Sequence, residues 1–129
     1  MKEIVKTAGA IMEQLRRYTG WRFEGGVKGD LCAVAVVLAN DEWKRVDVLL
    51  LFQDNDVLIK TTAWGESFDP ERMEQIQEKL DFPIEKEQKG KAFAISHHEP
   101  LGVLEHSVKG VLQECIIPMV NAVAETIAG

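Results

Sequence analysis

Apolar positions recur at three- and four-residue steps near the start of the chain, which is the spacing of one helix face. Residues 3–18 follow this pattern, with Ala8, Ile11 and Leu15 among the apolar positions. Gly9 lies inside the predicted helix, where a glycine costs about 1 kcal/mol relative to alanine. We therefore expect a close neighbour of the helix to require Gly9.

Four segments with the character of strands follow, either alternating or continuously apolar. They cover residues 21–24, 31–39, 43–53 and 57–64. Short polar turns separate the last three, which predicts an antiparallel meander. The segment at 31–39 contains no polar residue. We expect such a strand to be covered on both faces or to lie at the centre of a sheet.

Over residues 70–80 the apolar positions again recur at the spacing of a helix. Asp69 is a suitable N-cap, and Pro70 fits the first helical position. Two weaker strands are expected at 84–87 and 91–96. Together with the final helix, these elements predict a single α+β domain over residues 1–129. Its antiparallel sheet is flanked by helices, in the order α-β-β-β-β-α-β-β-α.

The final segment is predicted to form one long helix over residues 101–127, kinked at Pro118 because proline lacks a backbone donor. It is apolar over most of its circumference and needs partners on more than one side. We expect a second copy of the chain to cover one of its two apolar stripes, giving a homodimer. The residues of this candidate dimer or partner surface are Leu112, Ile116, Val120, Val123 and Ile127.

Charge and composition narrow the classes of function. The chain has 129 residues and a net charge of −6, which argues against general nucleic-acid binding. No apolar run approaches the ~18 residues of a membrane span. The N-terminal segment lacks the apolar core of a secretory signal, so we expect a cytoplasmic protein. The acidic excess is concentrated in residues 65–100, which carry −4, whereas residues 101–129 hold only four charged side chains.

Few residues suggest chemistry. His97, His98, Glu99 and His106 form one cluster that resembles a metal site. Adjacent residues of a strand point to opposite faces, so only one of the first two could join His106, and we expect no metal. Cys115 lies about two and a half helical turns after His106, too far for that histidine to activate it, and no catalytic residue is expected.

Other residues have a structural and a functional interpretation. Cys32 and Cys115 lie in apolar stretches and are expected to be buried thiols. The Gly-rich loop at 25–29 matches no phosphate-binding motif. Trp21, Trp43 and Trp64 lie at strand ends, where they would form core edges or a peptide-binding or dimer surface.

The acidic face of the middle helix, formed by Glu71, Glu74 and Glu78, is either solvated or a docking face for a basic partner.

The order of elements resembles the type III secretion chaperone-like fold, which includes the YbjN family. The resemblance rests on helices at 4–18, 70–80 and 101–127 and on strands at 31–39, 46–52 and 57–64. It implies a small, acidic, cytoplasmic and dimeric protein that holds an unfolded segment of a client.

These features favour a non-enzymatic protein-binding domain, chaperone- or adaptor-like, that acts as a homodimer and holds a client protein or peptide. The alternative is a small-molecule binding or sensory domain with a cavity between the sheet and the last helix. There the loop at 25–29 and Pro118 would shape the mouth of the cavity. A remote alternative is an enzyme of unknown class. No cofactor is expected.

Overall fold

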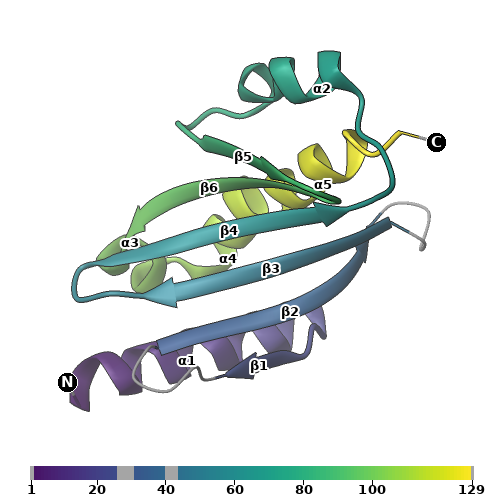
Figure 1. The fold of residues 1–129 in the computed structure, drawn as a ribbon. Coiled ribbons are helices and arrows are strands. Elements are labelled where there is room, and N and C mark those ends of the chain that lie inside the picture. The colour runs from purple at the N-terminus through teal and green to yellow at the C-terminus, as the bar shows by residue number, and fades with distance from the viewer. Residues whose placement is uncertain (1, 26–30, 40–43, 129) are drawn as a thin grey trace.

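A six-stranded antiparallel sheet organises the protein (Figure 1). The computed structural model describes residues 2–25, 31–39 and 44–128. The strands lie in the order β1-β2-β3-β4-β6-β5, and every neighbouring pair is antiparallel. Their bounds are β1 (Phe23–Gly25), β2 (Leu31–Ala39), β3 (Lys44–Phe52), β4 (Asp56–Trp64), β5 (Glu85–Lys89) and β6 (Ala92–Pro100). The predicted α+β class and the meander of β2, β3 and β4 are confirmed.

The helices lie on one side of this sheet or beyond its β5 edge (Figure 1). In Figure 1, α1, α4 and α5 are on one side of the sheet, and α2 lies beyond β5. The helix bounds are α1 (Lys2–Thr19), α2 (Pro70–Gln75), the 3-10 helix η1 (Ile76–Lys79), α3 (Leu101–His106), α4 (Val108–Val111), the π-helical turn η2 (Leu112–Ile116) and α5 (Ile117–Glu125). The Asp69 side chain caps α2, as predicted, by accepting from the backbone N–H groups of Glu71 and Arg72.

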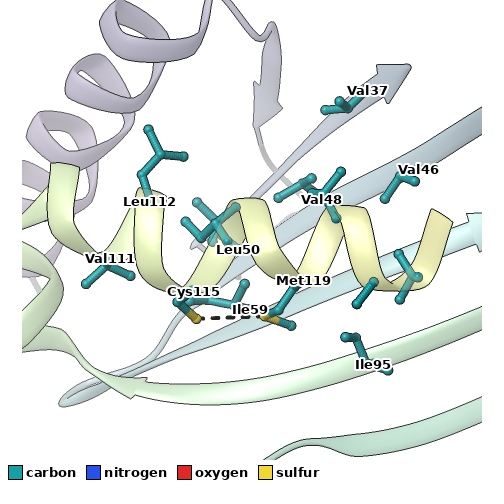
Figure 2. Packing of buried hydrophobic residues seen from close by; sticks show 14 of the residues in the cluster. Val37, Val46, Val48, Leu50, Ile59, Ile95, Val111, Leu112, Cys115 and Met119 are labelled. Atoms are coloured by element: carbon teal, nitrogen blue, oxygen red, sulfur yellow. Dashed lines mark hydrogen bonds between the residues drawn. The ribbon is translucent and has the colours of Figure 1, made fainter. Parts of the chain in front are cut away.

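The core lies between the sheet and the C-terminal helical segment. Alternate residues of the strands point to this layer, and Val46, Val48 and Leu50 of β3 are fully buried in it. Figure 2 shows them facing η2 and α5, from which Cys115 and Met119 point back. Burial of such side chains contributes roughly 1.5–3 kcal/mol each, so this layer holds the fold together.

The all-apolar strand β2 agrees with one of the two alternatives expected for it. It lies inside the sheet, between β1 and β3, but the described helices cover only one of its faces. Ala35 and Val37 point to the core and are buried, whereas Val36 is 56% exposed and Leu38 61% exposed. Of the two alternatives expected for this strand, a position inside the sheet is confirmed, whereas cover on both faces is not found among the described residues.

The C-terminal segment is helical, but it is not the single continuous helix that was expected. Ser107 has a non-helical backbone (φ −142°, ψ 70°) and separates α3 from α4. The π-helical turn η2 comes immediately before α5, and Ile117 N–H donates to the carbonyl of Leu112. This wider turn accommodates Pro118, whose ring would otherwise collide with a carbonyl one turn earlier.

Gly9 of α1 also differs from expectation. A Cβ added to Gly9 would have no heavy atom within 4 Å, apart from its chain neighbours and the backbone of its own helix. No close neighbour in the described part of the chain therefore requires a glycine here.

Candidate binding surface

The side of the sheet away from the helices is an open, largely apolar surface. We call it the open sheet face. It is formed by the outward-pointing residues of the four long strands β2, β3, β4 and β6, because alternate residues of a strand share one face. Within residues 2–25, 31–39 and 44–128, no helix lies against it. Its larger apolar side chains are exposed or half-buried: Val34, Val36, Leu38, Leu49, Leu51, Leu58 and Trp64.

The charged groups at the centre of the open sheet face are paired within the chain. Arg45 Nε lies 3.1 Å from Asp47 Oδ1, and the Trp64 indole N–H donates to Asp47 Oδ2 at 2.8 Å. The Arg45 guanidinium also lies 5.5 Å from the centre of the Trp64 ring. Lys60 pairs with Glu87 at 3.4 Å. The face is thus close to neutral, although the chain carries −6.

One half of the open sheet face is hollowed over β6. A hollow of about 410 Å³ lies there, with Ala92 and Ala94 at its base and Lys60, Trp64 and Glu87 around it. It exists because β6 presents two alanines between strands that carry long side chains. The open sheet face therefore has a raised aliphatic part on β2 and a depression over β6.

The predicted dimer stripe on the last helix lies elsewhere. The five residues are buried by the chain itself, at 0–7% exposure. Leu112 belongs to the cluster of buried hydrophobic residues drawn in Figure 2. A second copy would reach this stripe only if the helix left the sheet. The stripe is Leu112, Ile116, Val120, Val123 and Ile127.

A second hollow lies beside the C-terminal segment and is lined in part by polar side chains. It has a volume of about 690 Å³, and its lining includes Asp81, His97, Glu99, Glu114 and Cys115. Its lining comes both from β6, through His97 and Glu99, and from the C-terminal segment, which includes Pro118. A hollow between the sheet and the last helix, as expected for a small-molecule site, therefore exists at the β6 edge, whereas Met119 and Val123 are fully buried deeper between the two.

Both nitrogens of His97 are occupied. Its Nδ1–H donates to the Pro83 carbonyl at 2.9 Å, and Nε2 lies 2.7 Å from Glu99 Oε2. The Phe82 ring packs on the imidazole, with centroids 4.5 Å apart. His97 thus ties β6 to the segment before β5 and presents no unoccupied nitrogen to the hollow.

The thiol of Cys115 is held in its protonated form. Burial, together with the nearby negative charge of Glu99, raises the pKa of the Cys115 thiol to about 12. Its S–H donates to the Met119 sulfur at 3.8 Å, as Figure 2 shows. A thiol without thiolate character is a poor nucleophile.

The three histidines do not meet. His97 and His98 point to opposite sides of β6, and His98 pairs with Asp56 at 2.6 Å on the open sheet face. His106, at the end of α3, is exposed. In the part of the chain that the structure describes, no group of histidine, cysteine and carboxylate side chains could hold a metal ion. The pairing of His97 with Glu99 could have been predicted, because residues two apart on a strand share a face.

The remaining singled-out residues fall into three groups. Trp64 lies on the open sheet face, and Trp21 is half-buried, with its ring 6.2 Å from that of Phe23. Trp43 and residues 26–29 of the Gly-rich loop lie outside the described residues. The acidic residues Glu71, Glu74 and Glu78 are exposed on α2 and η1.

Comparison of the chain with models of protein families, with curated proteins and with solved structures finds no match. Among the described residues, no helix combines the length and apolar character needed to cross a membrane.

Proposed function

We propose that this chain is a non-enzymatic protein-binding domain that acts as a homodimer through its open sheet face. The observation that carries the proposal is the exposure of large aliphatic side chains on a face that no described helix covers. Val36 and Leu38 are 56% and 61% exposed. A contiguous exposed apolar surface on a small domain is typical of an interaction site.

The size of the face supports a dimer contact. Each long strand has nine residues, which corresponds to about 30 Å at about 3.3 Å per residue. Four such strands, about 4.8 Å apart, make a face about 20 Å wide and about 600 Å² in area. That is the lower bound, per partner, of a standard-sized interface.

The charge of the face favours a second copy as the occupant. Two chains of net charge −6 repel each other at most orientations. The open sheet face is the exception, because its Arg45–Asp47 and Lys60–Glu87 pairs are already neutralised within the chain. Two copies that approach through this face bring no net like charge together.

The chaperone- or adaptor-like part of the proposal is supported by the order of the elements, which resembles that of the type III secretion chaperone-like fold. In that role the homodimer holds an unfolded segment of a client protein. Catalysis is disfavoured by the polar side chains of the second hollow, since both nitrogens of His97 are engaged and Cys115 is protonated.

Sedimentation equilibrium tests the proposal. The wild-type chain is expected to dimerise at micromolar concentration. Val36→Lys should weaken the dimer by about 100-fold, since it places an ammonium group in the desolvated interface beside Asp47, whose charge Arg45 already neutralises. Val103→Lys is the matched control, because Val103 is similarly exposed, at 48%, but belongs to α3 on the other side. A monomeric wild type, or equal weakening by both variants, would overturn the proposal.

A small-molecule binding or sensory role is the second candidate. The 690 Å³ hollow beside the C-terminal segment favours it, because ligand sites commonly measure about 300–1,000 Å³. Native mass spectrometry of the purified protein would support this role if a ligand remained bound, and if Val103→Trp at the rim of the hollow displaced it.

A further inference from the structure

We infer that the two copies pack with their twofold axis parallel to the strands, so that β2 of each copy enters the hollow over β6 of the other. This inference rests on the proposed homodimer. It assigns one geometry out of the several that a face-to-face contact allows.

The register of the sheet defines rows of residues that run across the open sheet face. One row joins Val36, Asp47, Thr62 and Ala94, which are successive partners on β2, β3, β4 and β6. The next row begins with Leu38, which pairs with Arg45. It ends with Ala92, which pairs with Trp64.

Each row has a large side chain at one end and a small one at the other. Val36 and Leu38 project from β2 and are more than half exposed. Ala94 is only 5% exposed, because it lies at the base of the 410 Å³ hollow with Ala92. The bulky and hollow halves of the face are therefore complementary in shape, and they lie on opposite sides of its midline.

A half turn about an axis parallel to the strands, midway between β3 and β4, brings these halves together. The rotation places β2 over β6 of the other copy and keeps every row opposite itself. Val36 then faces Ala94, and Leu38 faces Ala92. Two sheets packed in this way lie about 10 Å apart with interdigitated side chains.

An axis running across the strands gives a poorer fit. It places β2 over β2 and β6 over β6. When this axis passes through the centre of the face, it also reverses the order of the rows along the strands. The hollow over Ala92 and Ala94 then faces Ser96 and His98 of the other copy and is not filled by the aliphatic side chains of β2, which costs contact energy that close-packed interfaces retain.

The central residues are also compatible with the first arrangement. It places β3 over β4 of the other copy, so that Leu51 faces Leu58, its partner in the register. In the row that contains Val36, Asp47 faces Thr62. No two like charges lie opposite each other in these rows, and the two leucines form an apolar centre.

A charge-swap experiment tests the geometry with two variants, Leu38→Glu and Ala92→Lys. Leu38 is 61% exposed, so far-UV circular dichroism should show an unchanged fold. Each variant alone should dimerise at least tenfold more weakly than the wild type. A mixture of Leu38→Glu and Ala92→Lys chains should regain a tight heterodimer, since one contact gains opposite charges and the other remains native.

The outcome separates the geometry from the homodimer itself. If the wild type dimerises and the mixture of Leu38→Glu and Ala92→Lys chains forms no tighter heterodimer than either variant alone, the inference is overturned, while the homodimer stands. A monomeric wild type overturns both. A mixture of Leu38→Glu with Val103→Lys chains is the control and should form no tight heterodimer, because Val103 lies on α3.

Discussion

Thr61 offers a prediction whose sign is unusual for a core substitution. It lies on β4, is fully buried, and is paired in the register with Val48 and Ile95, which are also fully buried. Its hydroxyl oxygen has no hydrogen-bond partner among the described residues. Thr61→Val replaces this hydroxyl with a methyl group of similar size, and should therefore stabilise the protein.

The magnitude follows from the desolvation of the hydroxyl. An unsatisfied buried polar group costs about 1–3 kcal/mol, and replacement by an apolar group of the same shape removes that cost. We expect a gain of about 1 kcal/mol. With a urea m-value of about 2 kcal/mol/M, this gain raises the unfolding midpoint by about 0.5 M.

The assay is equilibrium urea unfolding at one fixed protein concentration. The neighbouring Thr62→Val is the matched control, because Thr62 lies on the open sheet face and is not fully buried. Thr61→Val should raise the midpoint with an unchanged m-value, and by more than the control does. A lower midpoint for Thr61→Val would refute the reasoning, since it would mean that the Thr61 hydroxyl stabilises the native state.

Three further predictions concern single positions. Gly9→Ala should raise the free energy of unfolding by about 1 kcal/mol, because Gly9 is exposed, helical and has room for a methyl group. Thermal unfolding measures this gain, and a loss of stability would contradict the prediction. Gly110→Ala should stabilise the protein less than Gly9→Ala does, since the new Cβ would lie 2.5 Å from the Ser107 hydroxyl, which must rotate away. In urea unfolding the gain should be larger in a Ser107→Gly background, and an equal gain in both backgrounds would contradict this reasoning. In a Cys32→Ser background, Cys115 should resist a thiol reagent at pH 8 until the chain unfolds. The reason is that raising the pKa of the Cys115 thiol from 9.0 to about 12 lowers the population of the thiolate roughly 1,000-fold. Modification of the folded protein at the rate of an unfolded thiol would contradict the burial of Cys115.

The periodicity of the chain was sufficient for most of the sheet. The strands β2, β3 and β4 alternate or are continuously apolar, and their bounds agree with expectation to within a residue where both are described. The break at Ser107 was not predicted, because a single serine among apolar residues at helical spacing does not indicate the end of a helix more than any other polar residue does. The helix ends there through backbone geometry that the pattern does not encode.

The location of the binding surface was harder to predict than the fold. An apolar circumference on the last helix indicates that several partners cover it, but not whether they belong to the same chain. In the structure, α5 packs across β2, β3, β4 and β6, while α4 contacts α1, so the chain supplies the partners itself. The same ambiguity held for β2, whose continuous apolar character did not distinguish cover on both faces from a position inside the sheet with Val36 and Leu38 exposed.

The most direct test of the central claim is the molar mass of the wild-type chain and of Val36→Lys over a series of micromolar concentrations. The account predicts that the wild type reaches twice the 14.5 kDa of one chain. Val36→Lys should remain at the mass of one chain over the same range. A wild type that stays at the mass of one chain, or a Val36→Lys variant that dimerises as tightly as the wild type, would contradict the account.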